Sequence, residues 1–274
     1  HEWAVARIAA AQRPDLAIAA GDNSYLAATD RLLDRNIFRP LGELLREAPL
    51  YAVLGTPHDV VLDGGRSVRS ALDIPQSDRR EVVYGDVQVV MLGVQSSDAG
   101  VREFARQALA HGPFRHRLVV LHDPLKAGDP LLPVLRAAHV DAVISGNLHR
   151  YERRDVQGVV QLVVGTGGAP QSGEFTPRSA DAVVSLEGFG VLRLDVGRSE
   201  AKSEGVTGAK LVGSPFGAVG PTLGARLRAF GPAFVEGSLE ALVVFSRSEF
   251  LFDNFSVYDM PWVRVAARLA VGVS

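Results

Sequence analysis

The chain has 274 residues, of which 47% are hydrophobic and 22% charged, so it is large enough for one buried core or for a domain plus an appendage. This composition argues against disorder, and the net charge of -2 gives no support for nucleic-acid binding. The absence of cysteine excludes disulfides, thiolate zinc sites and cysteine nucleophiles. No apolar run approaches the roughly 18 residues of a membrane span, so none is expected.

The amino end carries neither an initiator Met nor a signal peptide. We therefore expect a fragment or a processed product, so any targeting segment would lie upstream of His1. Localisation stays open, and a secreted or periplasmic protein is one alternative if an upstream signal was removed. The sequence predicts no oligomeric state.

Helical patterns and apolar strands alternate along the first 196 residues. Helices are predicted over residues 3–12, 26–47 (broken near Pro40), 66–73, 100–111 and 130–139. Strands are predicted over 16–20, 50–54, 84–94 (as a strand pair or one bent strand), 118–121, 140–145, 159–164 and 189–196. Such alternation predicts a largely parallel sheet, which binds ligands beyond the carboxyl ends of its strands.

The composition changes after Gly197. Residues 198–235 are rich in Gly, Ala, Ser and Pro, and two apolar runs follow at 239–245 and 250–257. We expect these runs to be strands of a separate β unit. The chain then divides into a domain over 1–197, incomplete at its amino end, and a linker with a small β-rich extension over 198–274.

Side chains that can bind metals follow several of these strands. Asp22 comes after the first strand and a Gly, His122 ends a later strand, and Asn147 and His149 follow the strand over 140–145. Two residues apart in an extended segment, Asn147 and His149 are expected to point the same way. Carboxylate, amide and imidazole donors suit zinc, manganese or iron. We therefore expect a metal site at this edge of the sheet.

Each of these residues also has a structural interpretation. Asp22 is a candidate helix N-cap, His58 beside a Pro is a candidate loop histidine, and His122 is a candidate strand cap. The Gly-rich turn over 166–168 is a weak signal for a phosphate loop. The four remaining histidines lie at a terminus or near helix ends and are expected at the surface: His1, His111, His116 and His139.

The order and spacing of these motifs resemble the calcineurin-like metallophosphoesterases, especially the purple acid phosphatase branch. That pattern runs Gly-Asp-x-x-Tyr, Gly-Asn-His-Asp/Glu, a strand ending in His before Pro, Gly-His-x-His-x-Tyr-Glu-Arg and a Gly-Gly turn. The segments that match it lie between residues 4 and 196, at 21–25, 55–59, 122–124, 146–153 and 167–168.

The resemblance implies a mixed α/β fold, a β-sandwich flanked by helices. It implies that Asp22 bridges two metal ions (Fe, Mn or Zn), that Tyr25 and His149 bind the first, and that His122 and a weak Asn147 amide bind the second. His58 would stabilise or protonate the leaving group. A metal-bound hydroxide would then hydrolyse a small phosphate ester, as in acid phosphatases and phosphodiesterases.

The metal motifs are degenerate. The first family motif, Asp-x-Gly or Asp-x-His, would precede residue 1, Thr56-Pro57 replaces the Asn of the second motif, and Asn147 replaces a His. Since affinity depends on ligand number and type, we expect weak or impaired hydrolysis with one or two ions. The alternative is a non-catalytic phosphoesterase-like scaffold that binds a ligand or protein partner. A serine hydrolase is not favoured, because the chain has no Gly-x-Ser-x-Gly motif.

Overall fold

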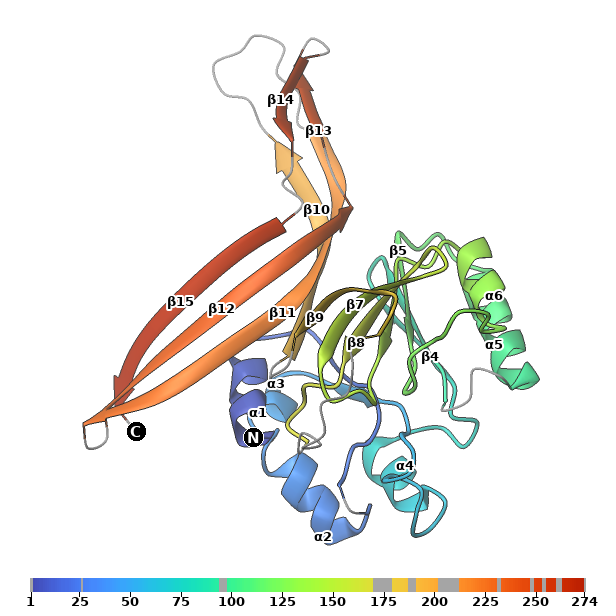
Figure 1. Ribbon diagram of the computed structural model, residues 1–274, viewed down its shortest axis with the longest axis vertical. Coiled ribbons are helices and arrows are strands. Elements are labelled where there is room, and N and C mark those ends of the chain that lie inside the picture. Colours follow the sequence, from blue (N-terminus) through green and yellow to red (C-terminus); the bar gives the residue numbers. More distant parts are fainter. Residues whose placement is uncertain are drawn as a thin grey trace. The chain divides into compact units, whose positions relative to one another are not determined.

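The computed structural model describes residues 2–25, 27–93, 98–169, 179–186, 191–201, 212–230, 233–246, 249–252, 255–259 and 263–273. The chain divides into two compact units, His1–Val191 and Leu192–Ser274 (Figure 1). The predicted motifs all lie in the first unit, which is called unit 1 below.

A seven-stranded mixed sheet forms the centre of unit 1. Its strands lie in the order β3 (Arg80–Tyr84), β4 (Val87–Met91), β5 (His116–Val120), β6 (Ala142–Ser145), β8 (Val159–Val164), β7 (Tyr151–Val156) and β9 (Ala182–Leu186). Neighbours from β4 to β8 are parallel, whereas β3, β7 and β9 pair antiparallel. The predicted fold class, a mixed α/β fold with helices against a sheet, is confirmed.

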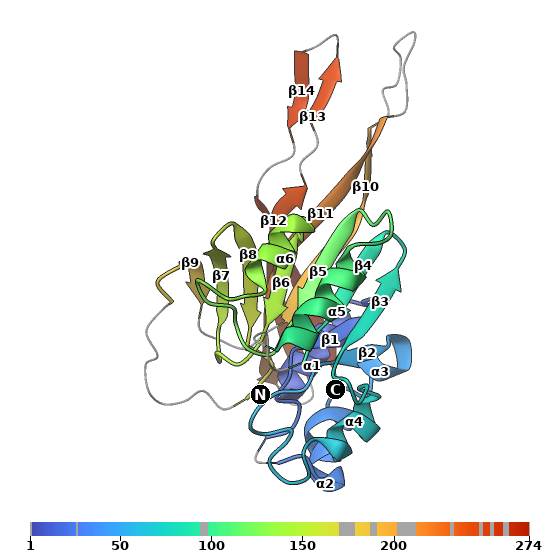
Figure 2. The same ribbon diagram turned by 90° about the vertical axis from the view of Figure 1, so that its right-hand side faces the viewer.

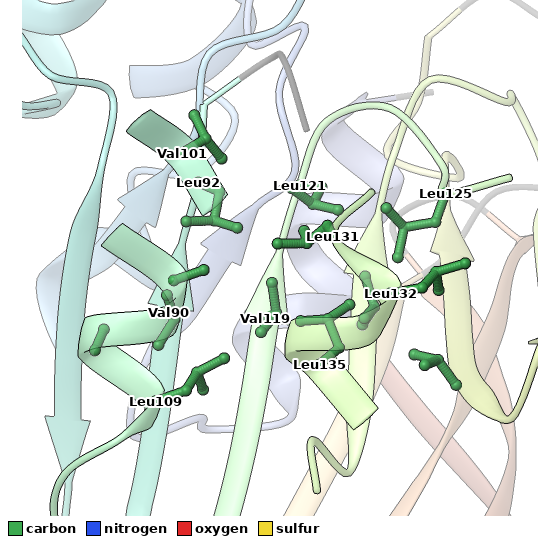
Figure 3. Packing of buried hydrophobic residues seen from close by; sticks show 14 of the residues in the cluster. Val90, Leu92, Val101, Leu109, Val119, Leu121, Leu125, Leu131, Leu132 and Leu135 are labelled. Atoms are coloured by element: carbon green, nitrogen blue, oxygen red, sulfur yellow. The ribbon is translucent and has the colours of Figure 1, made fainter. Parts of the chain in front are cut away.

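Helices α5 (Ala99–Leu109) and α6 (Leu132–Ala137) cover one face of this sheet (Figure 2). The sequence starts α5 with Asp98, whose carboxylate accepts the backbone N–H groups of Gly100 and Val101. Leucines from the helices pack onto valines of β4 and β5 in a continuous buried cluster (Figure 3). Each large side chain buried in this way stabilises the fold by about 1.5–3 kcal/mol.

A smaller layer holds the amino-terminal residues. Helix α1 (Glu2–Ala11) leads to β1 (Ala17–Ala19), which pairs in parallel with β2 (Leu50–Ala52). Between them lie α2 (Asp30–Leu33), a π-helical turn η1 (Asp34–Phe38) and α3 (Leu44–Glu47), so the predicted break near Pro40 is confirmed. Helix α4 (Arg66–Leu72) packs its Val68 and Leu72 into the same apolar cluster as Leu33 and Leu54.

Three predictions about unit 1 need refinement or correction. Residues 80–91 form a two-strand hairpin turning at Gly85, rather than one bent strand. Strand β7 was not predicted, because the segment Tyr151–Val156 is mostly charged. His116, which was expected at the surface, is buried with 4% of its area exposed, because it opens the central strand β5.

The second unit consists of strands in its described residues. A four-stranded sheet has the order β10 (Val191–Ala201), β11 (Val212–Phe230), β12 (Ala233–Ser246) and β15 (Val263–Val273). A hairpin of β13 (Glu249–Phe252) and β14 (Phe255–Asp259) completes it, where the sequence suggested a single strand. Strands therefore make up the described part of 198–274, and β11 lies within the segment that the sequence predicted as a linker. Among the helices that the structure describes, none has the length and hydropathy needed to cross a membrane.

Candidate metal centre

Glycines bring the ends of four strands close together. A Cβ on Gly55, after β2, would lie 2.0 Å from the backbone N of Asp22, and a Cβ on Gly21 would lie 2.3 Å from the His122 ring. A Cβ on Gly146, after β6, would lie 2.6 Å from the carbonyl oxygen of Ala20. Only residues without a side chain permit such approaches. The polar residues that follow β1, β2, β5 and β6 therefore meet at one edge.

Asp22 and His122 form a buried pair at this edge. The Asp22 Oδ2 and His122 Nε2 atoms are 3.6 Å apart, and the His122 side chain is fully buried. His122 Nδ1 lies 2.8 Å from the carbonyl oxygen of Ala20, which can only accept a hydrogen bond, so Nδ1 carries a proton. In the neutral ring, Nε2 then presents a lone pair to the carboxylate. Two facing lone pairs repel unless a proton or a cation lies between them.

The burial of Asp22 has an electrostatic consequence. Burial raises the pKa of its carboxyl group, and the nearby His122, His58 and His149 act in the opposite direction. Its Oδ1 atom is buried, and no described residue donates a hydrogen bond to it. A buried carboxylate with an unsatisfied oxygen is costly on its own, and a bound cation would remove that cost.

Tyr25 and His149 form a second pair of donors. The Tyr25 hydroxyl lies 2.9 Å from His149 Nε2, and the two rings meet edge to face with their centroids 5.8 Å apart. His58 packs on Tyr25 with ring centroids 4.5 Å apart. Burial and the carboxylates of Asp22 and Asp59 raise the pKa of the Tyr25 hydroxyl above its usual value. The phenol therefore stays protonated near pH 7 unless a cation stabilises its anion.

Asn147 does not share the site as the sequence suggested. Its backbone is in the left-handed region with φ of 62°, so residues 147–149 are not an extended segment. The side chain is exposed, and its Nδ2 donates to Asp123 Oδ1 at 2.6 Å, whereas His149 contacts Tyr25. The prediction that Asn147 and His149 point the same way is wrong, because the chain turns directly after Gly146.

The sequence analysis missed a buried carboxylate next to the site. Asp59, 1% exposed, accepts backbone N–H groups from Asn23 at 2.8 Å and Gly55 at 2.8 Å, and the Asn23 side-chain Nδ2 at 2.7 Å. In the sequence, Asp59 stands out only as the last residue of the segment 55–59, which matches the second family motif. Its position directly after His58, in a loop that ends a strand, is the signal that could have identified it.

Two pairs of possible donor atoms lie at separations near those of neighbouring ligands on one ion. With bonds of about 2.1 Å, neighbouring ligand atoms of an ion lie about 3.0–3.4 Å apart. The Asp22–His122 and Tyr25–His149 pairs, at 3.6 Å and 2.9 Å, are close to this spacing. In the part of the chain that is described, no group of three or more His, Cys, Asp and Glu side chains is arranged to hold an ion. The donors that fit a cation thus lie in two pairs.

Comparisons with known proteins identify a similar fold. Neither a protein-family model nor a curated protein matches the sequence. The solved structure of GAP50, the anchor in the inner membrane complex of Plasmodium, matches with a TM-score of 0.55 at 12% identity, over 95% of this chain and 83% of that chain. A Vps29 double mutant from Entamoeba histolytica matches with a TM-score of 0.32 at 14% identity, over 97% and 88%. The likeness to GAP50 concerns the fold alone, and the score for Vps29 is too low to support a common fold.

Proposed function

We propose that unit 1 is a phosphoesterase domain of the purple acid phosphatase kind, which slowly hydrolyses small phosphate esters with one or two bound Fe, Mn or Zn ions. The observation that supports this most is the buried Asp22–His122 pair, whose facing lone pairs are suited to a cation. The motif resemblance adds Tyr25 and His149 as further ligands. Asn147 is left out of this ligand set, since its side chain is bound to Asp123.

The residues of the chain have distinct tasks in this reaction. A bound ion would polarise a phosphate oxygen and acidify a water molecule. The hydrogen bond from His122 Nδ1 to Ala20 fixes the ring and keeps Nε2 available as a ligand. His58 packs against Tyr25, is only partly buried, and would protonate or stabilise the leaving oxygen.

Hydrolysis assays on the metal-loaded protein test this proposal. After loading with Mn²⁺, Fe²⁺ or Zn²⁺, we expect turnover of an aryl phosphate or an aryl phosphodiester. His58→Ala should lower kcat by about 100-fold or more, as expected for loss of a proton donor. His111→Ala is the matched control, because His111 is exposed and, among the described residues, contacts Glu81 and the carbonyl oxygen of Gln107 rather than the site. Absence of metal-dependent turnover, or equal rates for the His58 and His111 variants, would overturn the proposal.

The second candidate is a non-catalytic scaffold that binds a ligand or protein partner. It is favoured by one observation, the occupation of the Asn147 side chain by Asp123 where the family pattern has a metal-binding His. Elemental analysis after loading and desalting separates the candidates. Close to one equivalent of metal or more supports the enzyme, and less than about a tenth of an equivalent supports the scaffold.

A further inference from the structure

The loops after β1 and β2 are joined by the buried Asp59 carboxylate. Its Oδ1 accepts the backbone N–H groups of Asn23 at 2.8 Å and Ser24 at 3.3 Å. Its Oδ2 accepts the Asn23 Nδ2 group at 2.7 Å and the Gly55 N–H at 2.8 Å. Four donors from two separate loops therefore converge on one side chain that solvent does not reach.

Asn23 extends this connection. Its Nδ2 group also donates to the carbonyl oxygen of Val53 at 2.9 Å, so both of its amide hydrogens are used across the two loops. The residue is 6% exposed. Hydrogen bonds to a charged, buried acceptor are stronger than those between neutral groups, so this connection resists separation of the loops.

The connection has the site residues as direct chain neighbours. Two of the backbone N–H groups that Asp59 accepts belong to the two residues after Asp22, and the second of these residues precedes Tyr25. Asp59 itself follows His58. The Asp59 hydrogen bonds therefore hold the backbone directly beside Asp22, Tyr25 and His58 in place.

We propose that Asp59 is a positioning residue that holds His58 against Tyr25 and next to Asp22. The inference rests on the proposed function of the site. With 1% of its area exposed, Asp59 does not itself meet a substrate. It acts through the arrangement of its neighbours, which is the condition for a preorganised site.

The test compares Asp59→Asn with Asp63→Asn. The amide keeps the size of Asp59 but presents an NH₂ group to donors that need an acceptor. Asp63 is the matched control. It lies four residues after Asp59 in the same loop, and its carboxylate accepts the N–H groups of Gly65 and Ser67 instead of those next to the site. Nuclear Overhauser effects between the Tyr25 and His58 rings report the arrangement without reference to activity, and kcat for an aryl phosphate with Mn²⁺ reports its consequence.

We expect Asp59→Asn to lose the nuclear Overhauser effects between the Tyr25 and His58 rings. Its kcat should fall by at least 90%, with less than a threefold change in KM. Asp63→Asn should keep both. If Asp59→Asn does not fold, Asn23→Ala replaces it, since it removes only the side-chain part of the connection and should weaken the same Overhauser effects. Unchanged Overhauser effects in the folded variant would overturn the inference. If the wild-type protein shows these Overhauser effects but neither binds Mn²⁺ nor turns over substrate, the proposed function fails. The positioning role is then decided by the Overhauser effects of the Asp59→Asn variant alone.

Discussion

The loops after β2 and β6 begin alike and end differently. Each starts with a glycine, Gly55 or Gly146, that lets its strand approach the residues after β1. In the first loop, Asp59 fixes the backbone next to His58 with buried hydrogen bonds. In the second, Asn147 turns outward to Asp123. The loop after β2 is therefore held by buried hydrogen bonds, while the loop after β6 presents an exposed side chain bound to Asp123.

The difference indicates which changes the site tolerates. A buried carboxylate with four donors cannot be altered without leaving several groups unsatisfied, and each costs about 1–3 kcal/mol. An exposed amide bound to one exposed carboxylate costs little to replace. We expect mutations in the first loop to disturb both stability and chemistry, and mutations at Asn147 to disturb neither.

The largest effect is expected from Gly55→Ala. The new Cβ would meet the backbone N of Asp22 at 2.0 Å and its Oδ1 at 2.5 Å, contacts that only a backbone shift can relieve. Overpacking typically costs about 1–3 kcal/mol, and the contact with backbone atoms places this substitution at the upper end of that range. Gly167→Ala is the control, because nothing lies within 4 Å of its new Cβ. Urea unfolding of both variants measures the difference, and equal midpoints would show that the close approach after β2 is not required.

The next effect concerns metal affinity on the two sides of the site. His122→Ala removes a buried imidazole with an available Nε2, so the Kd for Mn²⁺ should rise by at least about tenfold. Asn147→Ala removes a side chain that is bound to Asp123, so the Kd should change by less than about twofold. Isothermal titration calorimetry measures both constants. A larger effect at Asn147 than at His122 would reverse the comparison.

The smallest effect concerns how stability changes with pH at two carboxylates of one loop. Acidification should change the contributions of Asp59 and Asp63 to stability in opposite directions. Burial raises the pKa of Asp59 above its ordinary value of 3.8, whereas hydrogen bonds from Ser67 lower the pKa of Asp63. As pH falls towards 3.8 through the raised pKa, the folded state takes up the Asp59 proton first, so wild type gains stability relative to Asp59→Asn. Below 3.8 the unfolded state takes up the Asp63 proton first, so wild type loses stability relative to Asp63→Asn.

Chemical unfolding between pH 3 and pH 7 measures these relative stabilities. The two wild-type-minus-variant curves should slope in opposite directions on acidification. Parallel curves would mean that the surroundings of the two carboxylates do not differ as the structure indicates.

Most of the fold followed from local patterns. The continuous apolar runs ending at Leu54, Leu121 and Ser145 predicted parallel strands. The residues after the strands do meet, Asp22 with His122 and Tyr25 with His149, although β1 and β2 form a sheet separate from that of β5 and β6. These features depend on periodicity and chain order, which a single sequence contains.

The missed features depend on contacts between distant residues. Strand β7 buries charged side chains because Arg150 pairs with Glu152 at 2.8 Å and Arg154 pairs with Asp181 at 2.7 Å. The second of these partners lies 27 positions away, so the charged segment resembles a surface loop in sequence. The turn at Asn147 and the buried hydrogen bonds of Asp59 were not predicted for the same reason. Each depends on a partner residue in another loop.

We expect a cation to bind between Asp22 and His122, with Tyr25 and His149 beside them. Titration with Mn²⁺, followed by the ring resonances of all histidines, tests it directly because a paramagnetic ion broadens the signals of nearby nuclei. The His122, His149 and His58 signals should broaden by one equivalent of Mn²⁺, while those of the exposed His111 and His139 should stay sharp. Unchanged His122 and His149 signals, or equal broadening of all histidines, would contradict it.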